Sequence, residues 1–341
     1  MLVDIVMLWL LAPINIWLTA AAASARQQQP PPLPPSPQED KPQQQQQDLT
    51  LVRKLKESQA PGGGCPCSSP SLCRPVARPT SHQQPEVVSY YLFDGSDDDL
   101  AHAFDNVAWV TVTTIMAIHA PPVSLVCTAH EHNRRVVLSV TPERSKWFAF
   151  DLDQQLKNAS ARRDWVVSLA AYCENHFLDG VNLDIEDNLP SNRAALTVLT
   201  QEVAAALRHS NPEAQISFAT RVDTEKFAGS VANFDYPGLA QYCDFFFVMG
   251  YDMNKGTTLA ESDGPIKPLE QSISRYISLG VNASKLVLGV ALFATDYTCT
   301  TTAIKRDQSG QATPANPCVK ITPWAESIQR RPIAGSLGKQ L

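Results

Sequence analysis

The amino-acid sequence predicts an α/β fold in which parallel strands alternate with helices. Short runs rich in apolar, β-branched and aromatic residues recur between residues 86 and 292, and helix-like stretches such as 162–175, 193–209 and 269–279 separate them. Strands separated by helices are typical of βαβ units, whose strands pair in parallel. One strand near the middle of the chain also carries acidic side chains on one of its faces, which indicates a functional site.

Residues 1–25 predict entry into the secretory pathway. The segment is mostly apolar, and Ala23-Ser24-Ala25 has the small-x-small form of a signal-peptidase site. An uncleaved membrane anchor is the alternative, because the run is nearly long enough to span a bilayer. Pro13 and Asn15 favour cleavage. We therefore expect a lysosomal or extracellular protein with no stable membrane association after cleavage.

Residues 26–64 are predicted to be a disordered linker. Residues 26–47 are almost all Gln and Pro, which leaves nothing to bury. Residues 48–60 could form a short helix, and Gly62-Gly63-Gly64 ends the linker. We place the folded domain at residues 65–341.

Seven strands are predicted within that domain, one fewer than in a closed (β/α)8 TIM barrel. They are Glu86–Phe93, Val107–Ile115, Arg135–Val140, Gly180–Glu186, Gln215–Thr220, Phe245–Tyr251 and Lys285–Leu292. Residues 295–341 are rich in Thr, Pro and polar residues and contain no convincing eighth strand. The sequence therefore predicts a barrel that is truncated after strand seven and incomplete at its C-terminal end, with two unpaired strand edges.

The fourth of these strands carries the most informative motif, Asp179-Gly180-Val181-Asn182-Leu183-Asp184-Ile185-Glu186. Polar residues alternate with aliphatic ones, so Asn182, Asp184 and Glu186 share one face of a strand. Carboxyl groups two positions apart are separated by roughly 6.6 Å along the strand, close enough for one to retain its proton. A retained proton is what a general acid needs. A calcium loop is disfavoured by the aliphatic residues between the acids, whereas an ordinary strand facing water remains an alternative. Asp179 is expected to bind backbone at the turn into the strand.

The motif resembles the Asp-x-x-Asp-x-Asp-x-Glu signature of family-18 glycoside hydrolases, with Asn182 at the second acidic place as in the chitobiase branch of that family. Further stretches from about residue 65 onward strengthen the resemblance. They are Cys65-Pro66-Cys67, Cys73-Arg74-Pro75, Cys127 with Ala129-His130, Arg135-Val136-Val137-Leu138, Cys243-Asp244-Phe245, Val248-Met249-Gly250-Tyr251-Asp252, Lys285-Leu286-Val287 and Asp296-Tyr297-Thr298-Cys299.

The resemblance implies hydrolysis of β-1,4 bonds between N-acetylglucosamine units, with retention and with help from the substrate's acetamido group. It implies that Glu186 is the general acid, that Asp184 orients the acetamide, and that Tyr251 hydrogen-bonds its oxygen. Asn182 would support Asp184, while Met249 and Asp252 would line the sugar site. The implied partner is an N-acetylglucosamine oligosaccharide, either the chitobiose core of N-glycans or a chitin fragment.

Two stretches depart from the family pattern. Residues 291–294 read Ala-Leu-Phe-Ala where the resemblance leads us to expect Pro-Trp-Tyr-Gly, and Arg221-Val222-Asp223 after the fifth strand matches no known role. A catalytically inactive, lectin-like barrel and a non-functional fragment are therefore kept as alternatives.

Composition narrows the remaining possibilities. The net charge of −6 offers no basic surface for nucleic acid, and no cofactor is indicated. His130 and His132 have a spacing seen in metal sites, but without a further ligand cluster we expect no metal.

Eight cysteines fit the secretory route, in which disulfides form. Cys299 and Cys318 could bridge a polar loop, whereas a Cys-x-Cys zinc site at Cys65 and Cys67 is an alternative to disulfides there. Asn158 and Asn282 begin N-glycosylation sequons.

Overall fold

The computed structural model describes the following residues of the chain: 65–77, 85–91, 107–118, 120–141, 156–186, 190–222, 233–253, 262–291, 293–294 and 331–332. All of them belong to one compact unit, residues 47–341. The expected signal segment, the linker and both cysteines of the 299/318 pair lie outside the described residues.

The centre of this unit is a parallel sheet of seven strands in the order of the sequence. The strands are β1 (Val88–Tyr91), β2 (Thr114–Ala117), β3 (Arg135–Val140), β4 (Gly180–Leu183), β5 (Gln215–Arg221), β6 (Phe245–Met249) and β7 (Leu286–Gly289). The sheet confirms the predicted parallel α/β fold. Within the described ranges β1 and β7 pair on one side only, and almost all of residues 295–341, where an eighth strand was not expected, lie outside them.

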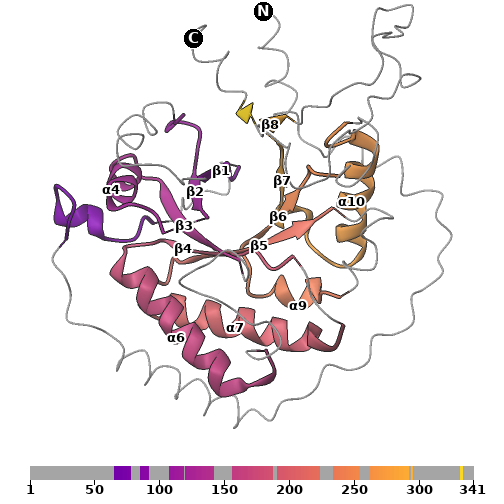
Figure 1. Ribbon diagram of the computed structural model, residues 1–341, viewed down its shortest axis with the longest axis horizontal. Helices are drawn as coiled ribbons and strands as arrows, with labels where there is room; N and C mark the ends of the chain where they lie inside the picture. Colours follow the sequence, from indigo (N-terminus) through magenta and orange to yellow (C-terminus); the bar gives the residue numbers. More distant parts are fainter. Residues whose placement is uncertain are drawn as a thin grey trace, which may run out of the picture. The chain divides into compact units, whose positions relative to one another are not determined.

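Helices cover the outer face of the sheet (Figure 1). They are α4 (Val123–Glu131), α6 (Ala159–Asn175), α7 (Arg193–Ser210), the short α9 (Tyr236–Leu239) and α10 (Ile266–Ser278). Three 3-10 turns, η3 (Pro70–Cys73), η4 (Pro190–Asn192) and η5 (Ala283–Lys285), and a small antiparallel pair, β8 (Phe293–Ala294) with β9 (Arg331–Pro332), complete the described elements. None of the described helices is long and apolar enough to cross a membrane.

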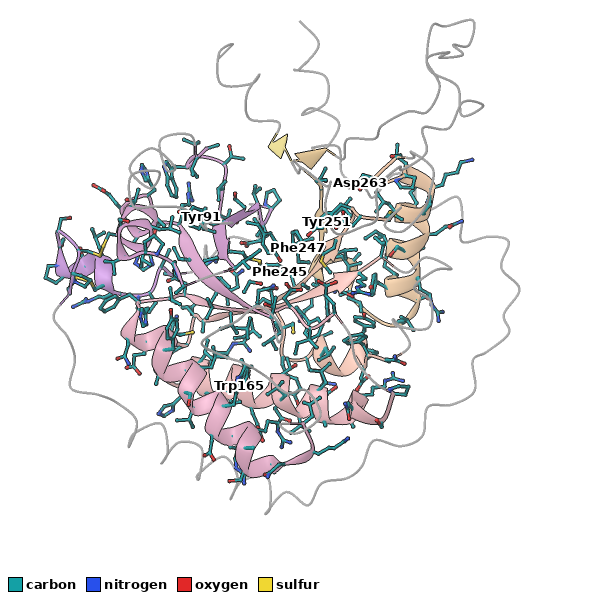
Figure 2. All side chains as sticks on the ribbon, in the orientation of Figure 1. Tyr91, Trp165, Phe245, Phe247, Tyr251 and Asp263 are labelled. Atoms are coloured by element: carbon teal, nitrogen blue, oxygen red, sulfur yellow. A yellow bond between two sulfur atoms is a disulfide. The ribbon has the colours of Figure 1, made fainter. Side chains whose placement is uncertain are left out.

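The alternation of side chains along the strands produces two apolar layers. Val181 and Leu183 of β4 and Phe218 of β5 pack toward the helices in the larger core cluster. On the inner side, Phe245 and Phe247 of β6 form a second cluster with Met116 and Val137. Figure 2 shows Phe245 and Phe247 of β6 on the inner side and Trp165 of α6 on the outer side.

Several strand predictions need correction at their ends. The sixth and seventh strands were predicted to reach Tyr251 and Leu292, but β6 ends at Met249 and β7 at Gly289. The run Val107–Ile115 was predicted as one strand, but residues 109–111 form a turn and β2 begins only at Thr114. Val110 is 92% exposed at this turn. An apolar, β-branched residue in this run is therefore not evidence that it belongs to a buried strand. The fourth strand was predicted to reach Glu186, yet β4 ends at Leu183 and the next three residues extend beyond the sheet pairing.

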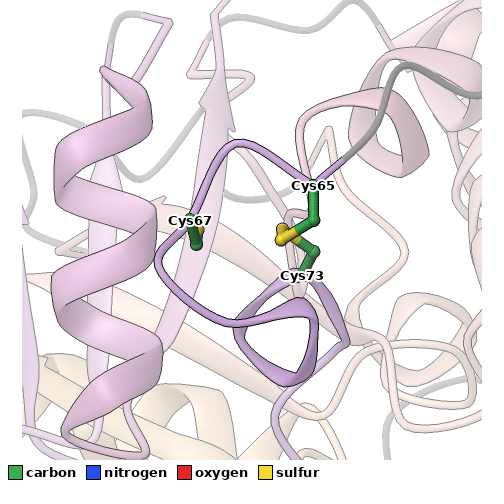
Figure 3. Close-up of side chains that lie close together, drawn as sticks. All are labelled: Cys65, Cys67 and Cys73. Carbon is green, nitrogen blue, oxygen red and sulfur yellow. A yellow bond between two sulfur atoms is a disulfide. The ribbon is translucent and has the colours of Figure 1, made fainter.

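The segment before β1 is joined to the domain by two disulfides. Cys65 pairs with Cys73, and Cys67 pairs with Cys127 of α4 (Figure 3). The sulfur atoms of Cys65, Cys67 and Cys73 lie within 4.8 Å of one another. Because all three are engaged in disulfides, they are not available as zinc-binding thiolates, and the zinc alternative is wrong for this structure.

Candidate active site

The acidic motif enters the sheet through Gly180. A side chain there would overlap the carbonyl oxygen of Gln215 on β5, so the close approach of the two strands requires glycine. Beyond β4, the amide of Asp184 still donates to Val140 O at 2.9 Å, which continues the pairing with β3 by one step. Asp184 and Glu186 are both half-buried, and Ile185 between them is buried. The two carboxyls therefore follow β4 at the carboxyl edge of the parallel sheet, where barrel enzymes carry their active sites.

Below these carboxyls, Asn182 is fully buried in a polar layer that crosses three strands. Its Nδ2 donates to Ser139 Oγ of β3 at 3.1 Å, and its Oδ1 accepts from Ser217 Oγ of β5 at 2.9 Å. Nδ2 also lies 3.3 Å from the hydroxyl of Tyr90 on β1. The amide is thereby held rigidly under the site, because buried polar groups that are fully bonded adopt one arrangement.

Tyr90 of β1 lies beside the predicted catalytic residues, although the sequence analysis did not identify it. Burial raises the pKa of Tyr90 well above its usual value, and the charge of Asp184, the neighbouring Tyr251 and Glu186 raise it further, against a lowering hydrogen bond from Asn182. Tyr90 and Tyr251 also pack against the same inner apolar cluster. The ring of Tyr90 packs 4.9 Å from that of Phe247, which fixes it on the inner side of the sheet.

The other predicted site residues lie at the end of β6 and directly after it. Met249, the last residue of β6, and Tyr251 are partly buried against the inner apolar cluster. Figure 2 shows Tyr251 in line with Phe245 and Phe247. Asp252 has a φ of 56°, a left-handed conformation that few residues other than glycine adopt, and it turns the chain away directly after Tyr251. Unusual backbone of this kind is often found at functional sites.

Arg221, the last residue of β5, lies directly beside the predicted acid. Its Nε donates to Glu186 Oε2 at 2.9 Å, and the side chains are 29% and 41% exposed respectively. The two residues line a small pocket together with Ile185, Ala219, Thr220, Phe234 and Tyr236. The arginine was noticed in the sequence but matched no role there.

Asp179 lies at the other end of β4 and takes no part in this site. Its fully buried carboxylate accepts the amides of Val76 and Val136, both at 2.7 Å, and bonds His130 Nε2 at 2.9 Å. The prediction that Asp179 binds backbone is therefore confirmed. His130 holds the Leu72 carbonyl through Nδ1 at 2.6 Å, and His132 stacks on Trp109, so both histidines have structural partners.

The comparisons with known proteins agree with the predicted family. Residues 120–336 match the family model for glycosyl hydrolases family 18. The chain is 28% identical over 249 residues to human di-N-acetylchitobiase, covering 70% of this chain and 58% of that protein. It is 27% identical over 246 residues to the mouse protein, covering 70% and 61%. The chain thus spans about three fifths of the length of these relatives.

Solved structures share the fold at lower identity. A family-18 N-acetylglucosaminidase from Paenibacillus barengoltzii superposes with a TM-score of 0.51 at 18% identity, covering 69% of this chain and 76% of that one. The second catalytic domain of a group II chitinase from Ostrinia furnacalis gives 0.51 at 18% identity, covering 64% and 67%. The match to the family model extends over more than half of the sequence and includes β3 to β7 with the acidic motif. The chain therefore belongs to family 18 of the glycosyl hydrolases.

Proposed function

We propose that this protein is a retaining glycoside hydrolase that cleaves β-1,4 bonds between N-acetylglucosamine units. The observation that carries the proposal is the position of Asp184 and Glu186 directly after β4, on the side of the sheet where Asn182 contacts Tyr90 and where Tyr90 and Tyr251 pack against the inner apolar cluster. Paired carboxyls and a hydroxyl at the carboxyl edge of such a sheet fit the chemistry that the family motif implies.

In the proposed first step, Glu186 donates its proton to the glycosidic oxygen as the bond from that oxygen to the anomeric carbon breaks. The acetamido oxygen of the same sugar attacks the anomeric carbon and forms a cyclic oxazolinium. In the second step, ionised Glu186 takes a proton from water, and the water oxygen attacks the anomeric carbon and opens the ring. Two inversions at one carbon give overall retention.

The neighbouring residues would prepare the acetamide for attack. Asp184 would accept a hydrogen bond from the acetamide nitrogen, and Tyr251 would donate one to its oxygen, so that the oxygen is held near the anomeric carbon. Asn182 would keep this layer rigid through its bonds to Ser139 and Ser217. Met249 and Asp252 would line the sugar. The relatives named chitobiase favour short chitin fragments or the chitobiose core of N-glycans as substrates.

A lectin-like protein that binds the same sugars without cleaving them is the second candidate. The observation that favours it is the bond from Arg221 to Glu186 Oε2, because that bond occupies one oxygen of the carboxyl that would have to reach the glycosidic oxygen.

Hydrolysis of chitotriose and of a glycan with a reducing-end chitobiose tests the proposal. The full chain is compared with Glu186→Gln and with Glu174→Gln, an acid at the end of α6 that serves as the matched control. We expect Glu186→Gln to lower kcat by about 10²-fold or more with only a small fall in unfolding temperature, since a general acid acts in the reaction and the ion pair that it loses with Arg221 is partly exposed. Glu174→Gln should leave the rate unchanged.

Turnover that survives in Glu186→Gln would overturn the assignment of the acid. Sugar binding by calorimetry without any product from the unmodified chain would establish the lectin-like alternative.

A further inference from the structure

We propose that Arg221 is a positioning residue for the catalytic acid: it anchors the carboxylate of Glu186 in the orientation from which the acid reaches the glycosidic bond. The inference rests on the proposed hydrolase function and concerns the residue that the family resemblance left without a role.

The register of the sheet places the two residues side by side. Leu183 of β4 pairs with Phe218 of β5, and three residues further along each strand are Glu186 and Arg221. Positions 182, 184 and 186 share the inner side with 217, 219 and 221, as the bond between Ser217 and Asn182 shows. Ala219, one step before Arg221 on the same side, is too small to separate the guanidinium from the acid. On its other flank Arg221 pairs in register with Met249 of β6. It therefore lies between the predicted acid and a residue predicted to line the sugar.

The backbone of Arg221 is fixed by buried groups on the helix side of the sheet. The hydroxyl of Tyr276 on α10 donates to the Arg221 carbonyl and lies 2.6 Å from Thr220 Oγ1. Tyr236 of α9 reaches the same Thr220 oxygen at 2.7 Å. Tyr236 is 1% exposed and Tyr276 is fully buried. These bonds fix the position of the backbone at the end of β5. The Arg221 side chain therefore extends toward Glu186 from a fixed point.

The charges around Glu186 show what Arg221 can do for it. Asp184 and the tyrosines 90, 236 and 251 face the acid's surroundings from β1, β4, α9 and β6, and Arg221 is the cation among these described groups. It can therefore hold the Glu186 carboxylate by a charge-assisted hydrogen bond. That bond fixes the orientation in which the carboxyl meets the glycosidic bond.

The experiment measures kcat and KM on chitotriose for the full chain and for Arg221→Gln and Arg221→Lys. We expect kcat to fall by about tenfold in Arg221→Gln with little change in KM, because a misplaced acid slows the chemical step more than it weakens sugar binding. Arg221→Lys keeps the charge and should return part of the lost rate.

Arg208→Gln is the matched control. Arg208 pairs with Asp244 at 3.2 Å with similar exposure, but at the opposite end of β5 and β6, where Asp244 also accepts the Ile216 amide. Its removal should leave kcat unchanged. A role for Arg221 in stability alone predicts an equally unchanged kcat for Arg221→Gln, and that result would overturn the inference.

A thermal-unfolding cycle of Arg221→Gln, Glu186→Gln and the double variant provides a readout that needs no activity. At low salt the double variant should lose less than the sum of the two single losses, because the pair is removed only once. Additive losses would show that the Arg221 and Glu186 side chains do not stabilise each other, and this would overturn the inference. If the unmodified chain releases no sugar at any pH while the cycle shows coupling, the proposed hydrolase function fails, and the role of Arg221 in catalysis fails with it.

Discussion

At the scale of single residues, Asp179 and Glu186 show how one short motif serves two purposes. Asp179 is fully buried and receives two backbone amides and His130, whereas Glu186 is 41% exposed by its side chain and faces Arg221. A buried carboxylate is stable only when its oxygens are bonded, and this one has three donors. The first acid of the motif therefore stabilises the fold, whereas the last is the proposed catalytic acid.

The His130–Asp179 pair predicts how stability depends on pH. Burial lowers the pKa of His130, but the bond to Asp179, the charge of Asp179 and the Leu72 carbonyl outweigh this, so that its pKa is raised above 6.5. A raised folded pKa means that the charged pair adds stability below about pH 6.5, the unfolded value, and that this contribution is lost as pH rises through the folded value. We expect the free energy of unfolding to fall across that window in the unmodified chain and to fall less in His130→Gln.

Urea unfolding at a series of pH values measures this difference. His209→Gln, at the exposed end of α7, is the matched control and should keep the slope of the unmodified chain. Equal slopes in His130→Gln and the unmodified chain would show that the histidine is not charged in the folded state.

The sequence predicts some of these residues well and others not at all, for a physical reason. Asp179 and the alternation from Asn182 to Glu186 are local patterns, so their faces follow from strand geometry. The roles of Tyr90 and Arg221 depend on which residues stand opposite them on neighbouring strands. That register is set by packing over the whole sheet, and no local pattern contains it. An arginine at a strand end, two residues beyond a small inward residue, was the available signal for Arg221.

At the scale of elements, the same distinction explains the correction at β2. Residues 107–115 have the composition of a strand, but Trp109 packs against α4 through His132 and the chain turns at residues 109–111. Aromatic and β-branched residues are favoured wherever they can be half-buried, in strands or beside helices. Composition located the region of β2, and tertiary contacts decided where pairing begins.

The two disulfides of the segment before β1 predict unequal effects on stability. Cys67–Cys127 closes a separation of 60 residues and Cys65–Cys73 one of 8. A cross-link removes more freedom from the unfolded chain when its loop is longer, about 4 against about 2.5 kcal/mol in the chain-entropy description. We expect the Cys67→Ser/Cys127→Ser variant to lose more unfolding free energy than Cys65→Ser/Cys73→Ser.

Urea unfolding of both double variants tests this order. The buried thiols Cys173 and Cys243 are present in each and cancel in the comparison. A larger loss in Cys65→Ser/Cys73→Ser would mean that native contacts near η3, and not the loop length, set the contribution of these bonds.

At the scale of the whole molecule, the predicted secretory route implies glycans at Asn158 and Asn282. Both asparagines are exposed caps: Asn158 Oδ1 accepts from the amides of Ser160 and Ala161, and Asn282 Oδ1 from Ser284. These bonds use the oxygen, whereas a glycan attaches to the nitrogen. We expect the protein secreted from eukaryotic cells to carry a glycan at each site.

Mass spectrometry before and after enzymatic deglycosylation measures occupancy. Asn158→Asp and Asn282→Asp keep the capping oxygen and remove the attachment site, so each should lose one glycan with little change in stability. Asn158→Ala removes both the attachment site and the capping oxygen. It should therefore also lower the free energy of unfolding by about 1 kcal/mol. An unchanged mass in the aspartate variants would contradict glycosylation at these positions.

The anchoring of residues 65–77 has a consequence for biosynthesis. Val76 donates a hydrogen bond to Asp179, 103 residues later in the sequence, and Cys67 forms its disulfide with Cys127, 60 residues later. During translation this segment is therefore synthesised before α4, β3 and β4, with which it is in contact in the folded protein. During that interval three neighbouring thiols can pair in wrong combinations, and disulfide exchange is slow compared with strand pairing. The first part of the domain to be synthesised is thus among the last to reach its native partners.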